Sequence, residues 1–479
     1  MELPLAGRVC VAFEGPGAGS GPLSWGQIES WNAVRTLGHW MPIGGALPLR
    51  PGTTVEDVAS ELRHHLSRHP TLRTLLRIPA DGGTPTQEVQ ASGFSLLEVY
   101  DTSGADPSAL ADAVAAAYRD TDLDFTAEYP IRMAVVLHHG VPSHVVALIS
   151  HFAADGAGAQ AMLRDVSAGS PALLRDVSAG SPAPVAGRQP LEQAQWQASP
   201  AGRRQNESAL RHFEGILRTM PPARFRTPAG PERPRFWRAV FDSAALPLAL
   251  RALTARTGAD PSAVLLAVFA MAVHATCGVD PVVVRPLVSN RFRPGLADVV
   301  CTAVQAGLCQ VPVAGLDFED VLPQARRAAT IAYKLAYFDQ RDLFTLLDRI
   351  GADRGERLEI GCFLNDRRDP STGVSPAAGD PSTAVDPSTA GELPTAGELP
   401  TAGEIEAALS RSAFGWVVRR AVPGFEPMIL DVEDTATGLR CTAHTDTAHI
   451  SPADTEALLR HLERIAVACA VTASAVRSG

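Results

Sequence analysis

The chain has 479 residues, of which 46% are hydrophobic and 20% are charged, and its formal net charge at pH 7 is −10. A chain of this length exceeds what one simple core organises, so two lobes or domains are expected. The negative charge disfavours general nucleic-acid binding, which needs a basic face. We therefore expect a soluble protein with no nucleic-acid partner.

Cysteine usage and the amino terminus bear on location. The seven cysteines are scattered, and no C-x-x-C pair occurs, which favours buried thiols in a reducing cytosol over disulfides or a zinc site. The opening MELPLAGRVCVAFEG has no charged-then-apolar leader, and the apolar run SAVLLAVFAMAVHATCG is too short to span a bilayer. We predict a cytoplasmic protein with no membrane partner and no bound metal.

The first half of the chain predicts helices followed by strands. Apolar residues at helical spacing predict helices over 21–37, 55–69 and 107–120. Two strand-like runs follow, at 130–140 and 142–152. Helices followed by strands that lead to a His-containing loop indicate α/β layering.

The second half repeats this pattern. Asp260 as a cap and Pro261 at the first helical position predict a helix that reads as a buried core helix. Further elements are predicted as a strand at 280–292, a short run at 307–313, a helix at 318–337, a strand at 357–366, a hairpin at 427–446 and a closing helix from Ser451.

Two tracts of the sequence read as insertions. RDVSAGSP occurs at 164–171 and again at 175–182, and 369–404 is built from DPSTA and GELPTA units. Pro and Gly recur too often there for helix or ladder, so a disordered low-complexity insertion is expected at about 369–404.

An Arg-rich connector separates the two halves. Residues 202–238 carry nine Arg against three Glu in a chain that is acidic overall. A solvated linker helix is the favoured interpretation, and a docking surface for an acidic partner is the alternative. Elsewhere, His65 and His69 lie on an Arg-rich helix and are expected to be solvated or capping.

The best candidate for chemistry lies in VALISHFAADGAG, residues 146–158. A strand that runs into His151, with Gly156 directly after Asp155, permits a tight turn that points the imidazole into a cleft. The pattern H-x-x-x-D-G alone is unspecific, and by itself it leaves a structural histidine as the better interpretation.

Five segments, taken in order, change that balance. They resemble the condensation domains of non-ribosomal peptide synthetases, within the chloramphenicol-acetyltransferase-like superfamily. The segments are LSWGQIESW (23–31), RHPTLRT (68–74), ISHFAADG (149–156), VSNRF (288–292) and LRCTAHTDTAHISPADTEALLRHLERI (439–465).

The resemblance implies an α/β fold of two chloramphenicol-acetyltransferase-like lobes, which form a V-shaped pseudo-dimer with the active site at the lobe interface. On this basis we predict an N-terminal lobe at 1–185, the connector at 186–238 and a C-terminal lobe at 239–479.

The resemblance also implies acyl transfer. The acyl group would arrive as a thioester on the phosphopantetheine arm of an acyl or peptidyl carrier protein, and a small-molecule amine or alcohol would attack it. His151 would accept the proton of this nucleophile, a role that contributes about 10²–10⁴-fold in rate. The chain itself is expected to bind no cofactor.

The remaining site residues receive structural roles. Asp155 is expected to pair with an arginine, because a partly buried carboxylate without a cation would be costly. The resemblance offers Arg291 and Arg73 as partners, and Arg291 is favoured. Gly156 is expected to allow the turn and to face the pantetheine arm. Ser150 replaces the first His of the family motif, and it would point to the opposite side of the strand from His151, which fits a structural role.

The preferred function is a freestanding condensation enzyme that forms an amide, or an ester, in natural-product assembly. The sequence shows no recognisable adenylation or carrier segment, so we expect the enzyme to act on carriers supplied by other proteins. One alternative is a non-catalytic condensation-like module that binds a carrier or recruits a tailoring enzyme, for which Ser150 is the main support. A further alternative is an acyltransferase that uses a soluble acyl-CoA.

Overall fold

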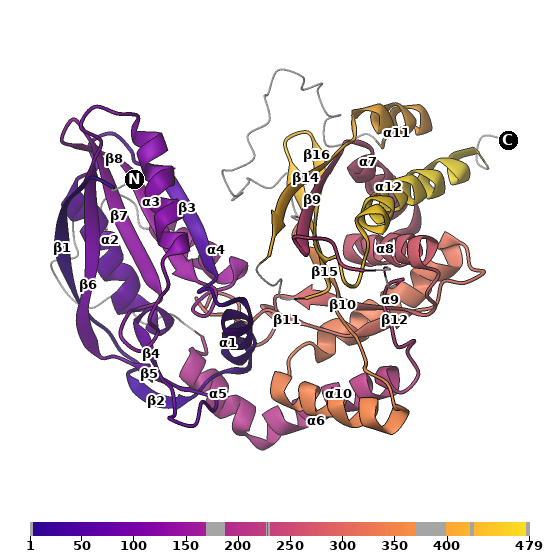
Figure 1. Cartoon of the computed structure of the whole chain (residues 1–479), viewed down its shortest axis with the longest axis horizontal. Coiled ribbons are helices and arrows are strands. Elements are labelled where there is room, and N and C mark those ends of the chain that lie inside the picture. Colours follow the sequence, from indigo (N-terminus) through magenta and orange to yellow (C-terminus); the bar gives the residue numbers. More distant parts are fainter. Residues whose placement is uncertain are drawn as a thin grey trace. The chain divides into compact units, whose positions relative to one another are not determined.

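A computed structural model describes residues 3–168, 187–226, 228, 230–368, 399–421 and 426–475 (Figure 1). The second RDVSAGSP copy and most of the predicted 369–404 insertion lie outside these ranges.

The described chain falls into two compact units. The first extends to Arg204 and includes Ser289–Val304, and the second contains the rest. The segment Ser289–Val304 thus belongs to the first unit, whereas the sequence analysis placed it in a lobe at 239–479. It lies in the sequence between two strands of the second unit, and nothing local in its composition marks the change. The predicted boundaries at 185 and 238 stay predictions.

The first unit is built on a five-stranded sheet with the order β1-β6-β7-β8-β3. Its strands are β1 (Leu5–Glu14), β6 (Ser92–Asp101), β7 (Ile131–His138), β8 (Val141–Ser150) and β3 (Pro42–Pro48). Only the β6–β7 pair among these strands is parallel. The two strands predicted at 130–140 and 142–152 are confirmed as the β7–β8 hairpin, which delivers the chain to Ser150.

Helices cover both faces of this sheet. α2 (Val55–Arg68) packs against β1, β6 and β7, and α3 (Pro107–Asp120) packs on β8, β3 and β7. The remaining elements of the unit are α1 (Trp25–Leu37), α4 (Gly156–Ala168), α5 (Pro190–Ala198), a short 3₁₀ turn at Pro70–Arg73 and a small sheet of β2 (Gly19–Pro22), β5 (Thr86–Val89) and β4 (Thr74–Arg77).

Local signals explain where these helices begin. Ser24 accepts a hydrogen bond from the Gln27 amide, and the Gln27 side chain accepts from the Ser24 amide, which completes a capping box for α1. Asp106 caps α3 ahead of Pro107. The helices predicted over 21–37, 55–69 and 107–120 are confirmed.

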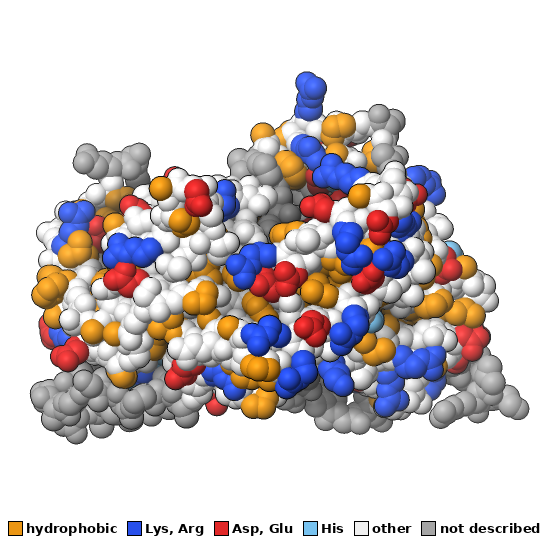
Figure 2. Space-filling model, turned by 90° about the horizontal axis from the view of Figure 1, so that it is seen from below, with side chains coloured by type: hydrophobic (Ala, Val, Ile, Leu, Met, Phe, Trp, Pro, Cys, Tyr) orange, Lys and Arg blue, Asp and Glu red, His pale blue; other side chains and the backbone are white. Residues whose placement is uncertain are grey.

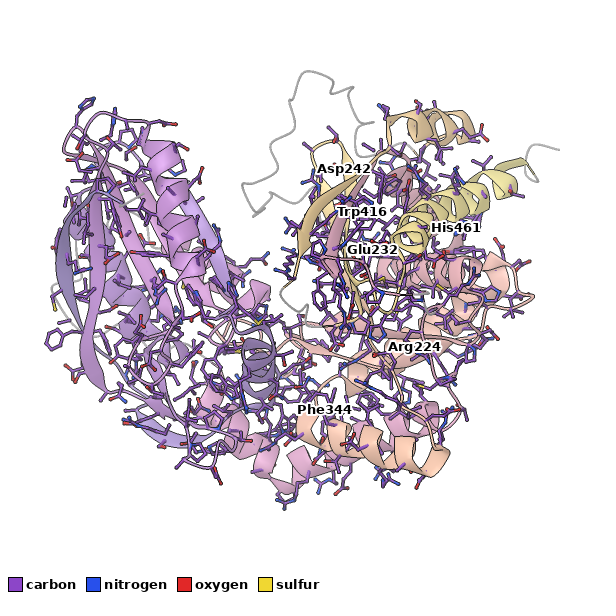
Figure 3. The ribbon with its side chains drawn as sticks, in the orientation of Figure 1. Arg224, Glu232, Asp242, Phe344, Trp416 and His461 are labelled. Carbon is purple, nitrogen blue, oxygen red and sulfur yellow. The ribbon has the colours of Figure 1, made fainter. Side chains whose placement is uncertain are left out.

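The second unit contains a larger mixed sheet with the order β11-β10-β13-β15-β16-β9-β14, and β12 pairs with β10. Its strands are β9 (Phe236–Ser243), β10 (Val282–Val288), β11 (Gln305–Ala306), β12 (Cys309–Val311), β13 (Cys362–Asp366), β14 (Ala413–Arg420), β15 (Met428–Thr435) and β16 (Gly438–Asp446). Figure 3 labels Trp416 on β14 and Asp242 on the neighbouring β9. The predicted hairpin at 427–446 is confirmed as β15–β16.

Helices complete the second unit. They are α6 (Pro200–Leu217, which begins in the first unit), α7 (Ala245–Thr257), α8 (Pro261–Cys277), α9 (Phe318–Leu335), α10 (Gln340–Arg354), α11 (Ala402–Ala408), a 3₁₀ turn at Leu409–Arg411 and α12 (Pro452–Ala475). α8 packs against α7, α9 and α12, and its buried residues lie on every side of the helix, which confirms a core helix.

Within the ranges that the structure describes, no single helix is both long and apolar enough to cross a bilayer. α7 and α8 reach that length and composition only when they are counted together, and they are bent by 116° relative to each other.

The Arg-rich connector forms α6 and the loop that follows it. On α6, Arg218 pairs with Glu214 at 2.6 Å and Arg211 lies 4.0 Å from Glu207. Arg224 (Figure 3) is buried and donates to the carbonyl oxygens of Glu359 and Pro221. Figure 2, which shows the molecule from below, has Lys and Arg side chains interspersed with Asp and Glu. The surface pairs on α6 favour the solvated-helix interpretation for that helix, whereas Arg224 in the loop is a buried structural residue.

The structure excludes solvated positions for two histidines at the end of α2, although His69 is the C-cap residue of the helix, as the capping alternative predicted. His65 and His69 are almost fully buried, and their rings stack with centroids 6.0 Å apart. Burial of both rings depends on contacts distant in sequence, so the charged residues around them gave a misleading signal.

The cap of α8 yields a stability prediction. Asp260 accepts hydrogen bonds from the amides of Ser262 and Ala263 at 3.0 and 3.2 Å. Asp260→Ala should lower the free energy of unfolding by about 1 kcal/mol in urea titrations followed by circular dichroism. Asp260→Asn keeps the cap and should lose much less. An Asn variant as unstable as the Ala variant would contradict a capping role.

Candidate active site

The end of β8 fixes the backbone of His151. The Ser150 hydroxyl donates to the Trp40 carbonyl at 2.7 Å and accepts from the Phe152 amide at 3.2 Å, and the residue is fully buried. The His151 amide donates to the Met41 carbonyl at 2.9 Å. Ser150 therefore holds the strand end together, while His151 itself is half-buried.

The carbonyl of His151 is also held. It accepts a hydrogen bond from the hydroxyl of Thr302, a residue of the segment 289–304. Both backbone polar groups of His151 are thus engaged, one by the β3 side of the sheet and one by this segment. These two attachments fix the backbone from which the imidazole projects.

Asp155 is saturated by four donors. Its Oδ1 accepts from Arg291 Nη2 at 2.5 Å and from the Gly158 amide at 2.8 Å. Its Oδ2 accepts from the amides of Ala303 and Val304 at 2.8 and 2.9 Å. The residue is 2% exposed. Its four hydrogen bonds tie together Arg291, Gly158, Ala303 and Val304, so the carboxylate is a structural group.

Arg291 closes the segment 289–304 on itself. Its Nη1 donates to the carbonyls of Leu296 and Val299 at 3.0 and 2.6 Å, and its Nη2 donates to the Cys301 carbonyl at 2.8 Å. Burial lowers the pKa of Arg291, but Cys301 and Asp155 outweigh this and raise that pKa above its ordinary value. The guanidinium therefore stays charged. The structure thus pairs Asp155 with Arg291, the partner favoured from the sequence.

Arg73, the alternative partner, lies elsewhere. It is fully buried, and its guanidinium donates to the carbonyl oxygens of Gln90 and Pro16. Burial lowers its pKa, while Tyr129 partly offsets the effect. Arg73 therefore joins loops of the first unit and is not brought to Asp155.

Glycine is required at a different position from the one predicted. Gly156 has a negative φ, and a Cβ built on it meets no described atom within 4 Å, so the turn does not depend on it. A Cβ on Gly158 would lie 2.7 Å from the Cys301 carbonyl oxygen, and one on Gly26 would lie 2.0 Å from that of Thr302. The expected role of Gly156 in the turn is corrected: the close approach occurs at Gly158.

The sequence analysis missed Gly158, Gly26 and Thr302. Each of them approaches a residue more than 100 positions away in the sequence, so no local spacing could reveal these contacts. Among the described residues, no group of three or more His, Cys, Asp and Glu side chains is placed to hold a metal ion.

These features define a class of protein. The chain has the chloramphenicol-acetyltransferase-like fold of condensation domains. A family model of the Condensation domain matches residues 42–342, and the chain belongs to this family.

Relatives and solved structures agree with this assignment. The chain is 28% identical over 366 residues to phosphinothricin tripeptide synthetase PhsC of Streptomyces viridochromogenes, a match that covers 72% of this chain and 32% of that protein. The chain thus spans about a third of the length of that relative. It is 26% identical over 327 residues to cyclosporin synthetase simA of Tolypocladium inflatum, a match that covers 65% of this chain and 2% of that protein.

Two solved structures show the same fold. One concerns condensation domain-mediated chain release from the enacyloxin polyketide synthase, with 20% identity, a TM-score of 0.66 and coverage of 96% of this chain and 85% of that chain. The other is the first condensation domain of the calcium-dependent antibiotic synthetase with a substrate analogue, with 16% identity, a TM-score of 0.61 and coverage of 95% and 97%.

The buried ion pair yields one prediction. Asp155→Asn leaves the Arg291 charge buried without its partner, which should cost about 3–5 kcal/mol in the free energy of unfolding. The matched control is Asp298→Asn, because Asp298 is 78% exposed and lies 3.6 Å from Arg164; its loss should cost less than about 1 kcal/mol. Similar losses in the two variants, measured by denaturant titration, would show that the Asp155–Arg291 pair does not stabilise the fold.

The glycine positions yield another prediction. Gly158→Ala forces the α4 backbone and the Cys301 carbonyl apart and should destabilise the protein by about 1–3 kcal/mol. Gly156→Ala adds the same methyl group into open space and should leave the melting temperature nearly unchanged. A reversed order of the two melting temperatures would show that the turn depends on Gly156 after all.

Proposed function

We propose that the chain catalyses acyl transfer of the condensation type. It would join the acyl group of a carrier-protein thioester to an amine, or to an alcohol, and so form an amide or an ester. The supporting observation is that Asp155 and His151 of the same loop differ in burial and in hydrogen bonding. Asp155 is saturated and buried, whereas the side chain of His151 is only half-buried, on a backbone that is held at both its N–H and its C=O.

In the proposed reaction the nucleophile attacks the thioester carbonyl carbon. The new C–N or C–O bond forms, the C–S bond breaks, and the pantetheine sulfur leaves. His151 accepts the proton that the nucleophile loses and returns it to the leaving sulfur, so the imidazole is neutral before and after turnover. Such general-base catalysis contributes about 10²–10⁴-fold, and alignment of the two substrates adds to it.

Condensation domains work with carrier proteins that present a phosphopantetheine arm. The open space beside the Cα of Gly156 supports passage of such an arm next to the His151 loop. The paired arginines of α6 support carrier docking less well, because their charges are already balanced by Glu207 and Glu214. Action on carriers supplied by other proteins, by a freestanding enzyme, stays a prediction.

One observation favours a second candidate, a module that binds a carrier without chemistry: Ser150 stands where the family motif has its first His. Its contacts weigh against this interpretation, because the buried hydroxyl bonds to Trp40 and Phe152 and leaves the attachment of His151 intact. We therefore favour acyl transfer.

The test follows product on a chemically loaded acyl carrier by intact mass, with panels of amines and alcohols and with acyl-CoA as a parallel donor. His151→Ala should slow product formation by about 10²–10⁴-fold, because the general base is lost. Ser150→Ala is the matched control at the neighbouring position; it should cost about 1 kcal/mol of stability and keep most of the activity.

The outcomes separate the candidates. Equal rates for wild type and His151→Ala would remove His151 from the mechanism. Tight binding of the loaded carrier without product from the wild type would support the binding module. Product from acyl-CoA but not from the loaded carrier would indicate the soluble-donor acyltransferase.

A further inference from the structure

A cavity outside the His151 loop lies in the first unit, between β6 and α3. Its volume is about 490 Å³, within the range of about 300–1,000 Å³ that small-molecule sites occupy. α3 packs on β8, β3 and β7. The β6 side chains on the same face of the sheet therefore lie beside the helix and are not covered by it. All residues that line the cavity lie between 94 and 133.

Alternate residues of β6 give the cavity two chemically different ends. Phe94, Leu96, Glu98 and Tyr100 follow one another at intervals of two, so they share one face of the strand. Phe94 is 69% exposed and Leu96 is 53% exposed, whereas Tyr100 is buried. An exposed apolar pair beside a recessed polar pair is the pattern of a binding site for an amphipathic molecule.

The polar end is organised around the Glu98 carboxylate. Its Oε2 accepts the hydroxyls of Tyr100 and Tyr118 at 2.7 and 2.8 Å, and its Oε1 accepts Arg8 Nε at 3.0 Å. Burial raises the pKa of Glu98, but these three hydrogen bonds outweigh it and hold that pKa below its ordinary value. Glu98 is therefore ionised at neutral pH.

Three donor side chains on the cavity wall, Tyr100, Tyr118 and Arg132, already have acceptors. Both tyrosine hydroxyls give their protons to Glu98. The Arg132 guanidinium, on the cavity wall, donates to the carbonyls of Tyr118, Thr121 and Asp122 and to Glu128. This end also offers acceptor capacity, in the phenolic oxygens and the remaining carboxylate lone pairs.

We infer that this cavity binds a small apolar amine in its ammonium form. The ring or alkyl body packs on Phe94 and Leu96, and the N–H groups point to Glu98 and the tyrosine oxygens. At this end the ionised Glu98 carboxylate disfavours an anionic ligand, and a plain hydrocarbon would leave its remaining acceptor sites unused. The inference stands apart from acyl transfer, since no residue of the His151 loop lines the cavity.

The experiment is isothermal titration calorimetry of the whole chain with three ligands of similar shape: 2-phenylethylamine, 2-phenylethanol and 3-phenylpropionate. The amine should bind saturably at one site per chain and at least about tenfold more tightly than the alcohol or the acid. His151→Ala should bind the amine as the wild type does, which separates this cavity from the acyl-transfer site.

Three variants localise the binding. Glu98→Gln keeps the shape but removes the charge, and it should abolish the preference for the amine over the alcohol. Phe94→Ala removes the exposed ring without touching the polar end, so it should weaken all three ligands while it keeps their order. The matched control is Leu47→Ala, an exposed leucine of β3 that does not line the cavity, and it should change nothing.

The inference would be overturned by any of three results. The first is the absence of saturable binding of the amine up to millimolar concentration. The second is tighter binding of the acid than of the amine. The third is an amine affinity that Glu98→Gln and Phe94→Ala, both shown to be folded by circular dichroism, leave at the wild-type value.

Discussion

The ion pair between Asp155 and Arg291 is the interaction on which the candidate active site depends. The two residues are 136 positions apart in sequence, and together they fix the start of α4 and the whole segment 289–304. A buried pair of this kind repays its desolvation only when further hydrogen bonds complete it. Here the amides of Gly158, Ala303 and Val304 complete the carboxylate, and three backbone carbonyls accept hydrogen bonds from the two Nη groups of the guanidinium.

The Asp155–Arg291 ion pair has a direct effect on the position of the His151 backbone. Thr302, which lies next to the two amides that bind Asp155, reaches the His151 carbonyl, while Met41 holds the amide from the other side. The histidine is thus positioned through its backbone. This explains how the neighbouring position can be a serine. The Ser150 hydroxyl binds the strand end, whereas Thr302 of the segment 289–304 binds the His151 carbonyl.

Sequence signals predicted the elements whose causes are local. Caps at Ser24 and Asp260, helical apolar spacing and the β7–β8 hairpin all lie within a few residues of what they determine. The burial of His65 and the demand for glycine at 158 come from atoms far away in the chain, so spacing could not reveal them. Arg291 was found through a family resemblance and a charge argument together, which is how a distant partner can be anticipated.

The membership of Ser289–Val304 in the first unit has a consequence for how the chain can be divided. Both strands that flank this segment, β10 and β11, belong to the second unit. A fragment that stops near Arg204 would keep Asp155 but lose its cation, its two amide donors from 303 and 304 and the hydroxyl that holds His151. The first unit is therefore complete only when the polypeptide continues to Val304, beyond the first strands of the second unit.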